Sequence, residues 1–157
     1  MSKTTPATLA LTKAGVPFTL ATYDYDPNAE RIGLQAAEAM GVPASEVFKT
    51  LMAELDGKPV CAIVPSDEEV NMKKLAAALG GKSAHMMKVP DAERLTGYKV
   101  GGISPLGQRK PVPTALDELA TLYDEIYLNG GQRGLQIRIR PDDLVAALGC
   151  ITADLVR

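Results

Sequence analysis

The sequence predicts an α+β fold with a mixed or antiparallel sheet, and three observations support this prediction. Strand-like segments occur in pairs joined by short turns, helical segments are interspersed among them, and no regular strand–helix–strand repeat is present. The chain has 157 residues, of which 46% are hydrophobic and 23% are charged, a composition typical of a globular domain. We therefore expect residues 1–157 to form one packed domain.

Four segments have helical spacing and are bounded by glycine or proline. They are residues 5–14, 30–40, 72–79 and 141–149. Glycine ends a helix readily because it adopts the left-handed conformation of a C-terminal cap at no steric cost. We expect these helices to cover a β-sheet core.

Strand-like residues lie at 18–23 and in two predicted hairpins. Residues 47–55 and 59–64 flank an Asp-Gly dipeptide, which is strongly favoured in two-residue hairpin turns. Residues 125–129 and 135–140 flank a glycine-rich loop and form the second predicted hairpin.

Composition excludes several classes of protein. Lys and Arg total 17 against 19 Asp and Glu, a net charge of −2. We therefore expect no DNA binding, and any contact with another nucleic acid must be small and directed. The apolar runs are far shorter than the ~20 residues that a membrane helix needs, and the start of the chain does not resemble a secretory signal. A cytoplasmic protein without membrane contact is expected.

The reactive side chains do not form a familiar catalytic set. His85 is the sole histidine, and Cys61 and Cys150 are the sole cysteines. One imidazole cannot supply a zinc site and an acid–base pair together, and no Gly-x-Ser-x-Gly turn occurs. In a cytoplasmic chain the two cysteines are expected to be free, buried thiols. The sequence predicts no metal and no cofactor.

One lysine in the first hairpin has an unusual position. Alternation along its strand places Lys49 on the same face as four apolar residues. These are Val47, Leu51, Ala53 and Leu55. Because burial of an unpaired ammonium is costly, such a lysine is expected at the mouth of a cavity or beside an anion. The alternative is a bulge or a strand end that turns Lys49 into solvent.

Glycine and basic residues are concentrated between residues 94 and 134. The segment at 101–107, Gly-Gly-Ile-Ser-Pro-Leu-Gly, could bring backbone N–H groups close to an oxyanion or phosphate, although turns also need glycine. Its spacing matches neither common nucleotide-binding glycine motif. Between Arg94 and Leu116 the basic residues are Arg94, Lys99, Arg109 and Lys110, and no residue is acidic. Together they predict a small anion site or a solvated surface.

Several short motifs together resemble the YbaK/EbsC family. In chain order they are Phe48-Lys49-Thr50-Leu51, Gly97-Tyr98, the segment 101–107, Pro113-Thr114 and Gly-Gly-Gln-Arg-Gly-Leu at 130–135. The resemblance covers essentially the whole chain. It implies the fold of the prolyl-tRNA synthetase editing domain, a mixed and partly barrel-like β-core with surrounding helices. Members of the YbaK type are Cys-tRNA(Pro) deacylases, so it also implies a free-standing editor of mischarged tRNA.

The resemblance further implies roles for particular residues. Lys49 would anchor the 3′-terminal adenosine or its phosphate, and Gly101 and Gly102 would bring backbone N–H groups near the scissile ester. The implied substrate-binding residues are Tyr23, Ser104, Asn129, Gly131, Arg133 and Gln136. Some members have Ser and Asp where this chain has Asn129 and Gln136, which changes charge and donor pattern.

The mechanism that the family implies needs no nucleophile from the protein. The thiol of the cysteine substrate attacks its own ester carbonyl, and the protein orients the groups and supports the developing charge. The expected partners are the acceptor end of tRNA(Pro) and prolyl-tRNA synthetase. Two alternatives remain open. One is an editor of Ala-tRNA(Pro) or another small aminoacyl-tRNA, and the other is a non-catalytic module that binds adenosine, a tRNA end or a protein.

Overall fold

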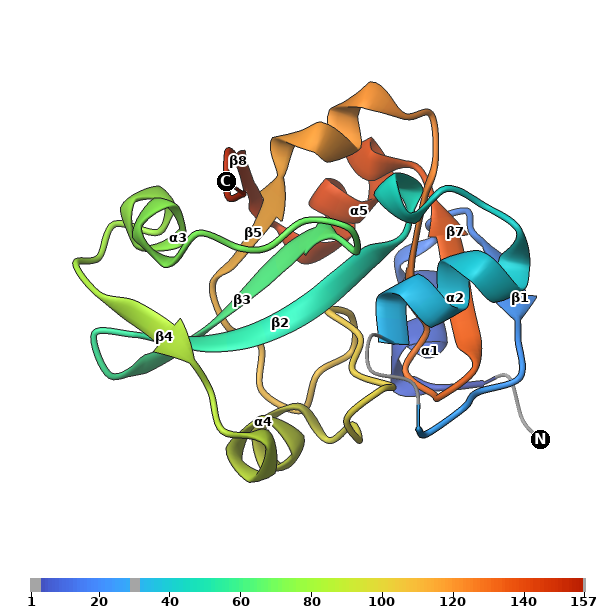
Figure 1. The fold of residues 1–157 in the computed structure, drawn as a ribbon, viewed down its shortest axis with the longest axis horizontal. Helices are drawn as coiled ribbons and strands as arrows, with labels where there is room; N and C mark the ends of the chain where they lie inside the picture. Colours follow the sequence, from blue (N-terminus) through green and yellow to red (C-terminus); the bar gives the residue numbers. More distant parts are fainter. Residues whose placement is uncertain (1–3, 29–31, 157) are drawn as a thin grey trace.

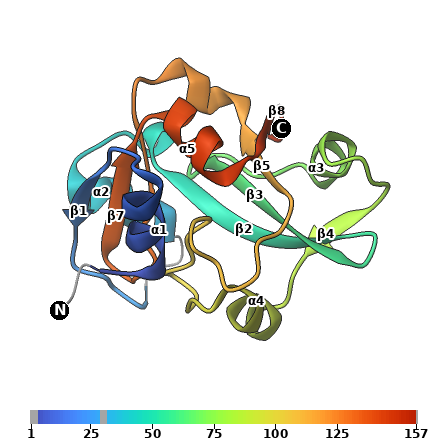
Figure 2. The same cartoon turned by 180° about the vertical axis from the view of Figure 1, so that it is seen from behind.

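The computed structural model describes residues 4–28 and 32–156, which form two β-sheets surrounded by helices (Figure 1 and Figure 2). The helices are α1 Pro6–Ala14, α2 Ile32–Met40, α3 Met72–Ala78, α4 Val89–Thr96 and α5 Pro141–Leu148, with 3-10 turns η1 Ala44–Glu46 and η2 Glu118–Leu122. The strands are β1 Thr19–Thr22, β2 Phe48–Leu55, β3 Lys58–Pro65, β4 Ala84–Met86, β5 Thr114–Asp117, β6 Ile126–Asn129, β7 Leu135–Ile139 and β8 Ile151–Ala153.

The smaller sheet is antiparallel and the larger one is mixed. Their strand orders are β1-β7-β6 and β4-β2-β3-β5-β8. In the larger sheet β2 is antiparallel to β3 and β4, whereas β3, β5 and β8 run parallel to one another. A parallel bridge between Val47 and Tyr127 joins the start of β2 to β6. The predicted α+β fold with a mixed, partly barrel-like core is thus confirmed.

The main hydrophobic core contains residues from both sheets. Phe48 and Ile63 of the larger sheet cluster with Leu128 and Ile137 of the smaller sheet, and all four are at most 2% exposed. Full burial of side chains of this size contributes about 1.5–3 kcal/mol each. A second cluster includes residues of β2, β3 and α3, and a third packs α2 against Val47. The start of β2 is therefore fixed between two clusters.

The two predicted hairpins are confirmed. Asp56 and Gly57 have φ angles of 50° and 83°, as a type I′ turn between β2 and β3 requires. The second hairpin pairs β6 with β7, with Asn129 directly opposite Gln136.

The predicted helices are confirmed where the structure describes them. α1 begins after Thr5, whose hydroxyl accepts a hydrogen bond from the Thr8 N–H at 3.2 Å, and Gly15 ends it with φ 71°. The predicted helix at residues 30–40 is described from Ile32 onward as α2, and its first two residues lie outside the described part. The strand predicted at 18–23 is shorter and corresponds to β1.

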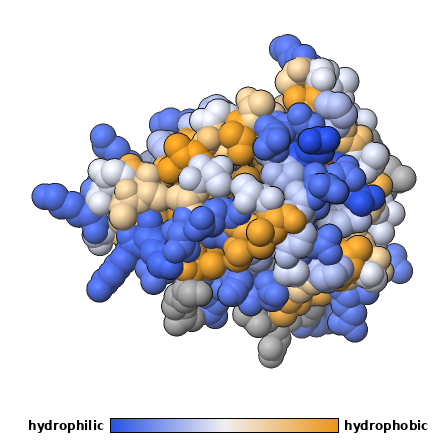
Figure 3. Space-filling model, turned by 90° about the horizontal axis from the view of Figure 1, so that it is seen from above, coloured by the Kyte–Doolittle hydropathy of each residue, from blue (hydrophilic) through white to orange (hydrophobic). Residues whose placement is uncertain are grey.

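The surface seen from above in Figure 3 is a mixture of hydrophilic and hydrophobic patches. The exposed large hydrophobic side chains come from separate segments, for example Leu9, Met86, Leu122 and Ile151. Within residues 4–28 and 32–156, no helix combines the length and the apolar character needed to span a bilayer.

Candidate active site

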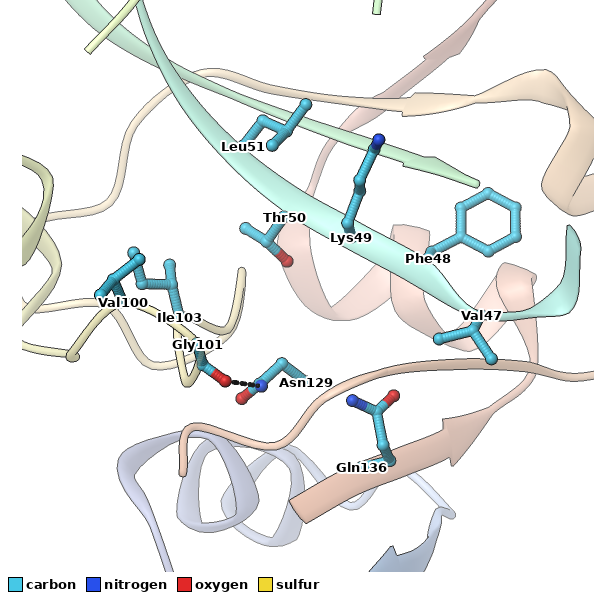
Figure 4. A pocket seen from close by; sticks show the side chains of 10 residues that line it. All are labelled: Val47, Phe48, Lys49, Thr50, Leu51, Val100, Gly101, Ile103, Asn129 and Gln136. Carbon is cyan, nitrogen blue, oxygen red and sulfur yellow. Dashed lines mark hydrogen bonds between the residues drawn. The ribbon is translucent and has the colours of Figure 1, made fainter. Parts of the chain in front are cut away.

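A hollow of about 230 Å³ opens where β2 lacks a neighbouring strand. β4 pairs with β2 only at residues 53–55, and the bridge to β6 lies at Val47. The hollow is lined by Val47 and residues 48–51 of β2, by residues 100, 101 and 103, and by Asn129 and Gln136 (Figure 4). The hollow therefore lies between the start of β2 in the larger sheet and the β6–β7 hairpin of the smaller sheet.

The open edge of β2 presents the backbone of Thr50 to this hollow. Residues in a strand direct their backbone groups alternately to one side and the other. The Met52 carbonyl accepts from the Met87 N–H on the β4 side at 3.1 Å, and the Val47 carbonyl accepts from the Ser66 N–H on the β3 side at 2.8 Å. Thr50 therefore directs its N–H and C=O to the β4 side, beyond the point where β4 ends.

Two buried polar atoms at the hollow have no hydrogen-bond partner among the described residues. They are Thr50 Oγ1 and Gln136 Oε1. Gln136 is only 4% exposed, and a buried polar atom without a partner costs about 1–3 kcal/mol. Such atoms in a folded protein need an explanation. A bound molecule that donates hydrogen bonds would supply one.

Asn129 uses both ends of its side chain to hold two loops together. Its Nδ2 donates to the Gly101 carbonyl at 2.9 Å, the bond drawn in Figure 4, and its Oδ1 accepts from the Gly131 N–H at 2.7 Å. Arg133 adds a second link, because its Nε donates to the Val100 carbonyl at 2.9 Å. The loop at 100–103 and Asn129 thus form one wall of the hollow, and the loop at 130–134 is hydrogen-bonded to that wall.

The contact between these loops requires glycine at two predicted site positions. A Cβ on Gly102 would lie 3.0 Å from the Arg133 nitrogen, and a Cβ on Gly131 would lie 2.8 Å from Tyr98 Cε1. The Gly102 N–H already donates to the Lys99 carbonyl at 2.8 Å. Of the two glycine N–H groups expected near an ester, only that of Gly101 has no hydrogen bond within the described residues.

Lys49 lies in the wall of the same hollow and is half-buried. It is directly opposite the buried Val64 on β3. Figure 4 shows Lys49 and Thr50 pointing to opposite sides of β2, with the Lys49 ammonium directed away from Asn129 and Gln136. The structure thus brings Lys49 to the hollow, but on the face of the strand opposite to the two carboxamides.

The remaining predicted residues lie elsewhere. Tyr23 and Arg133 line a second hollow, and Tyr23 Oη is buried without a partner among the described residues. Burial raises the pKa of Tyr23, and the nearby Gly134 backbone partly offsets that rise. Ser104 is fully buried in a turn, where its Oγ accepts from the Leu106 N–H at 3.2 Å, and it lines neither hollow.

Thr50 lines the hollow but was not predicted as a site residue. The sequence does contain a signal for this residue, because strand alternation places the Thr50 hydroxyl on the same face as the apolar Phe48 and Met52. What the sequence does not show is that the strand beside Thr50 stops short, which leaves both its hydroxyl and its backbone open to the hollow.

The cysteines and the histidine lie away from this hollow. Cys61 and Cys150 are free thiols as predicted, and Cys150 is half-buried rather than buried. Burial raises the pKa of Cys61 to about 12, so its thiol is not a ready nucleophile. His85 is exposed on β4, with Nε2 3.2 Å from Glu54 Oε1. Among the described residues, no cluster of His, Cys, Asp and Glu could hold a metal.

Comparisons with known proteins agree with the motifs. The sequence profile of the aminoacyl-tRNA editing domain family matches residues 26–147. EbsC of Enterococcus faecalis, described as a candidate Cys-tRNA(Pro)/Cys-tRNA(Cys) deacylase, is 40% identical over 111 residues, 70% of this chain and 68% of that protein. The proline–tRNA ligase of Geobacter metallireducens is 41% identical over 68 residues, 43% of this chain and 12% of the ligase.

A solved structure shows the same similarity in three dimensions. It is that of a candidate trans-editing enzyme for prolyl-tRNA synthetase, and it superposes with a TM-score of 0.84 at 25% identity. The superposition covers 97% of this chain and 95% of the other. By its sequence profile and its closely similar relative, the chain belongs to the aminoacyl-tRNA editing domain family.

Proposed function

We propose that this protein, as a single domain, is a trans-editing deacylase that hydrolyses the aminoacyl ester of mischarged Cys-tRNA(Pro) in the cytoplasm. The observation on which the proposal rests most is the hollow at the open edge of β2, where Thr50 and Gln136 present buried polar atoms that have no partner among the described residues. Its volume of about 230 Å³ suits a small aminoacyl group. The substrate class follows from the family and from the relative described as a Cys-tRNA(Pro) deacylase.

The lining of the hollow favours chemistry performed by the substrate. None of the described residues that line it is a cysteine, a histidine or a carboxylate. In the proposed reaction the sulfur of the cysteinyl group forms a bond to its own carbonyl carbon, the ester carbon–oxygen bond breaks, and the ribose oxygen receives the thiol proton. Water then opens the cyclic thioester. Orientation for such intramolecular attack can account for roughly 7–11 kcal/mol of the barrier.

The residues around the hollow would then position the substrate and stabilise the charge that develops during its cleavage. The Gly101 N–H would donate to the developing oxyanion, a contribution of about 2.7–4 kcal/mol in other enzymes. Thr50 and Gln136 would accept hydrogen bonds from the aminoacyl-adenosine, and Lys49, on the other face of β2, would hold its phosphate. Prolyl-tRNA synthetase is the proposed partner that delivers tRNA(Pro).

Single-turnover deacylation of four esters of tRNA(Pro) tests this proposal. We expect the cysteinyl ester to be cleaved rapidly and the seryl ester, of nearly equal size but without a thiol, to decay at its spontaneous rate. The alanyl and prolyl esters should also persist. Equal cleavage of the cysteinyl, seryl and alanyl esters would instead indicate an activated water, and no cleavage of any ester would refute a deacylase.

A matched pair of lysine variants tests the role of Lys49. Lys49→Ala should slow cleavage of Cys-tRNA(Pro), whereas Lys58→Ala, which removes an exposed lysine at the far end of the hairpin, should not. Normal turnover by Lys49→Ala would remove this side chain from the mechanism and leave the deacylase activity itself unaffected.

A further inference from the structure

A second hollow lies next to the candidate active site, on the outer part of the glycine loop. We call it the Arg133 hollow. It is lined by residues 22–25 after β1, by Ala39 of α2 and by residues 132–135, and it encloses about 840 Å³. Residues 132–134 line this larger hollow, and Arg133 is bonded to the loop at 100–103, which lines the small one. The larger hollow is of a size that accommodates a nucleotide.

Arg133 connects the two hollows. Its Nε donates to the carbonyl of Val100, which lines the small hollow. Its guanidinium carbon lies 5.3 Å from the centre of the Tyr25 ring. Arg133 is exposed, and its two terminal nitrogens make no hydrogen bond or ion pair within the described residues. Asp24 also lines this hollow, but no ion pair joins it to Arg133.

A second arginine–tyrosine pair, between β7 and β6, shows how the surroundings of Arg133 differ from those of another stacked arginine. Arg138 lies over the Tyr127 ring at 5.6 Å, a nearly identical stack. Its Nε, however, is 3.3 Å from Glu125 Oε1, and the pair lines neither hollow. The charge of Arg138 is thus neutralised by a carboxylate, whereas that of Arg133 is available to a ligand.

We propose that the Arg133 hollow binds the nucleotide that precedes the terminal adenosine of the tRNA acceptor strand. Its phosphate would receive hydrogen bonds from the terminal nitrogens of Arg133, and its unpaired base would stack on the guanidinium that Tyr25 supports. Arginine planes backed by aromatic rings are common platforms for unpaired RNA bases, and the arginine fork matches a phosphate. The inference rests on the proposed function, because it requires an aminoacylated adenosine in the small hollow.

Two cysteinyl esters of different length test the inference. One is the 3′-cysteinyl ester of adenosine 5′-monophosphate, which carries the phosphate proposed to bind Lys49, and the other is a cysteinylated RNA trinucleotide that ends in the same nucleotide. Stacking of one base predicts that wild type prefers the trinucleotide by about tenfold in kcat/KM. In Tyr25→Leu this preference should fall toward one, and in Arg133→Lys, which keeps the charge but loses the flat fork, it should fall partly.

Tyr127→Leu is the matched control, because it removes the ring of the neutralised stack and should leave the preference at its wild-type value. Equal kcat/KM values for the two esters in wild type, or an undiminished preference in Tyr25→Leu, would overturn the inference. If neither ester is hydrolysed, the proposed function fails. Binding of the uncharged trinucleotide then decides the subsite: wild type should bind it about tenfold more tightly than Tyr25→Leu, and equal affinities would refute it.

Discussion

Asn129 and Gln136 lie opposite each other on β6 and β7, and the protein uses the same chemical group in opposite ways at the two positions. The carboxamide of Asn129 is satisfied by the backbones of Gly101 and Gly131. Gln136 is almost fully buried, yet its Oε1 has no partner in the described chain. A satisfied buried carboxamide stabilises the fold, whereas an unsatisfied one lowers stability until a ligand pairs with it.

The difference separates the site into two regions. The Asn129 region, with the two glycine loops and Tyr98, is a scaffold in which the Asn129 carboxamide has partners at both ends. The Gln136 region, with Thr50 and the open edge of β2, is available for substrate. Variants in the scaffold should therefore lower stability and activity together, and variants in the open region should lower activity alone.

The largest loss of activity is expected for Asn129→Asp. The variant keeps an acceptor for the Gly131 N–H but loses the donor to the Gly101 carbonyl and places a carboxylate against it. Loss of this part-buried bond, with a carboxylate placed against the carbonyl, costs about 1–3 kcal/mol. We expect cleavage of Cys-tRNA(Pro) to fall by up to about a hundredfold, together with a lower free energy of unfolding, measured by urea denaturation at pH 7.

The pH dependence of the stability of Asn129→Asp distinguishes loss of the hydrogen-bond donor from a nonspecific loss of stability. A protonated carboxyl can again donate to the Gly101 carbonyl, so the stability gap to wild type should narrow as the pH falls from 7 toward 4. Asn71→Asp is the matched control, because Asn71 caps α3 and aspartate caps a helix equally well. A gap that does not change with pH would contradict the donor role.

Gln136→Leu should lower activity without lowering stability. Leucine has a similar volume and brings no polar atom into the buried position, so the cost of the unpaired Oε1 disappears. We expect cleavage to fall by about tenfold, while the midpoint of thermal unfolding stays equal or rises. A variant that loses both activity and stability would place Gln136 in the scaffold.

The sequence was sufficient to predict the elements whose conformation is set locally. The Asp56-Gly57 turn, the glycine-bounded helices and the glycine loop between β6 and β7 depend on residues close together in the chain, so their patterns predict them. The family motifs also identified Lys49, Gly101, Asn129 and Gln136, which do line one hollow.

The rest depends on pairings between distant segments. β4, β5 and β8 are only three or four residues long, too short for a clear alternation, and α4 was not predicted. The early end of β4, which opens the edge of β2 beside Thr50, is set by tertiary structure. The engagement of the Gly102 N–H with Lys99 likewise has no sequence signal.

Gly131→Ala tests the scaffold by overpacking. Its Cβ would lie 2.8 Å from the Tyr98 ring, and its φ is 94°. Gly149→Ala is the matched variant, because Gly149 also has a positive φ, 64°, but a Cβ there meets nothing within 4 Å. We expect Gly131→Ala to be less stable than Gly149→Ala by about 1–3 kcal/mol in urea unfolding. Equal losses would show that the loops can separate without cost.

The smallest expected effect concerns Tyr98, the ring against which Gly131 packs. Burial raises the pKa of Tyr98 to about 12 from 10.0, and its hydroxyl donates to the Leu106 carbonyl at 2.6 Å. Because the unfolded chain releases this proton near pH 10 while the folded chain keeps it, the stabilisation is complete below pH 10 and is lost as the pH rises toward 12. Tyr98→Phe should therefore be less stable than wild type at pH 8, and this difference in the free energy of unfolding should narrow between pH 10 and 12.

Cys61 changes the pH dependence of stability in the same direction in both proteins, so its effect cancels in the comparison. A gap that stays constant would mean that the Tyr98 hydroxyl ionises in the folded protein and that this part of the scaffold is open to water.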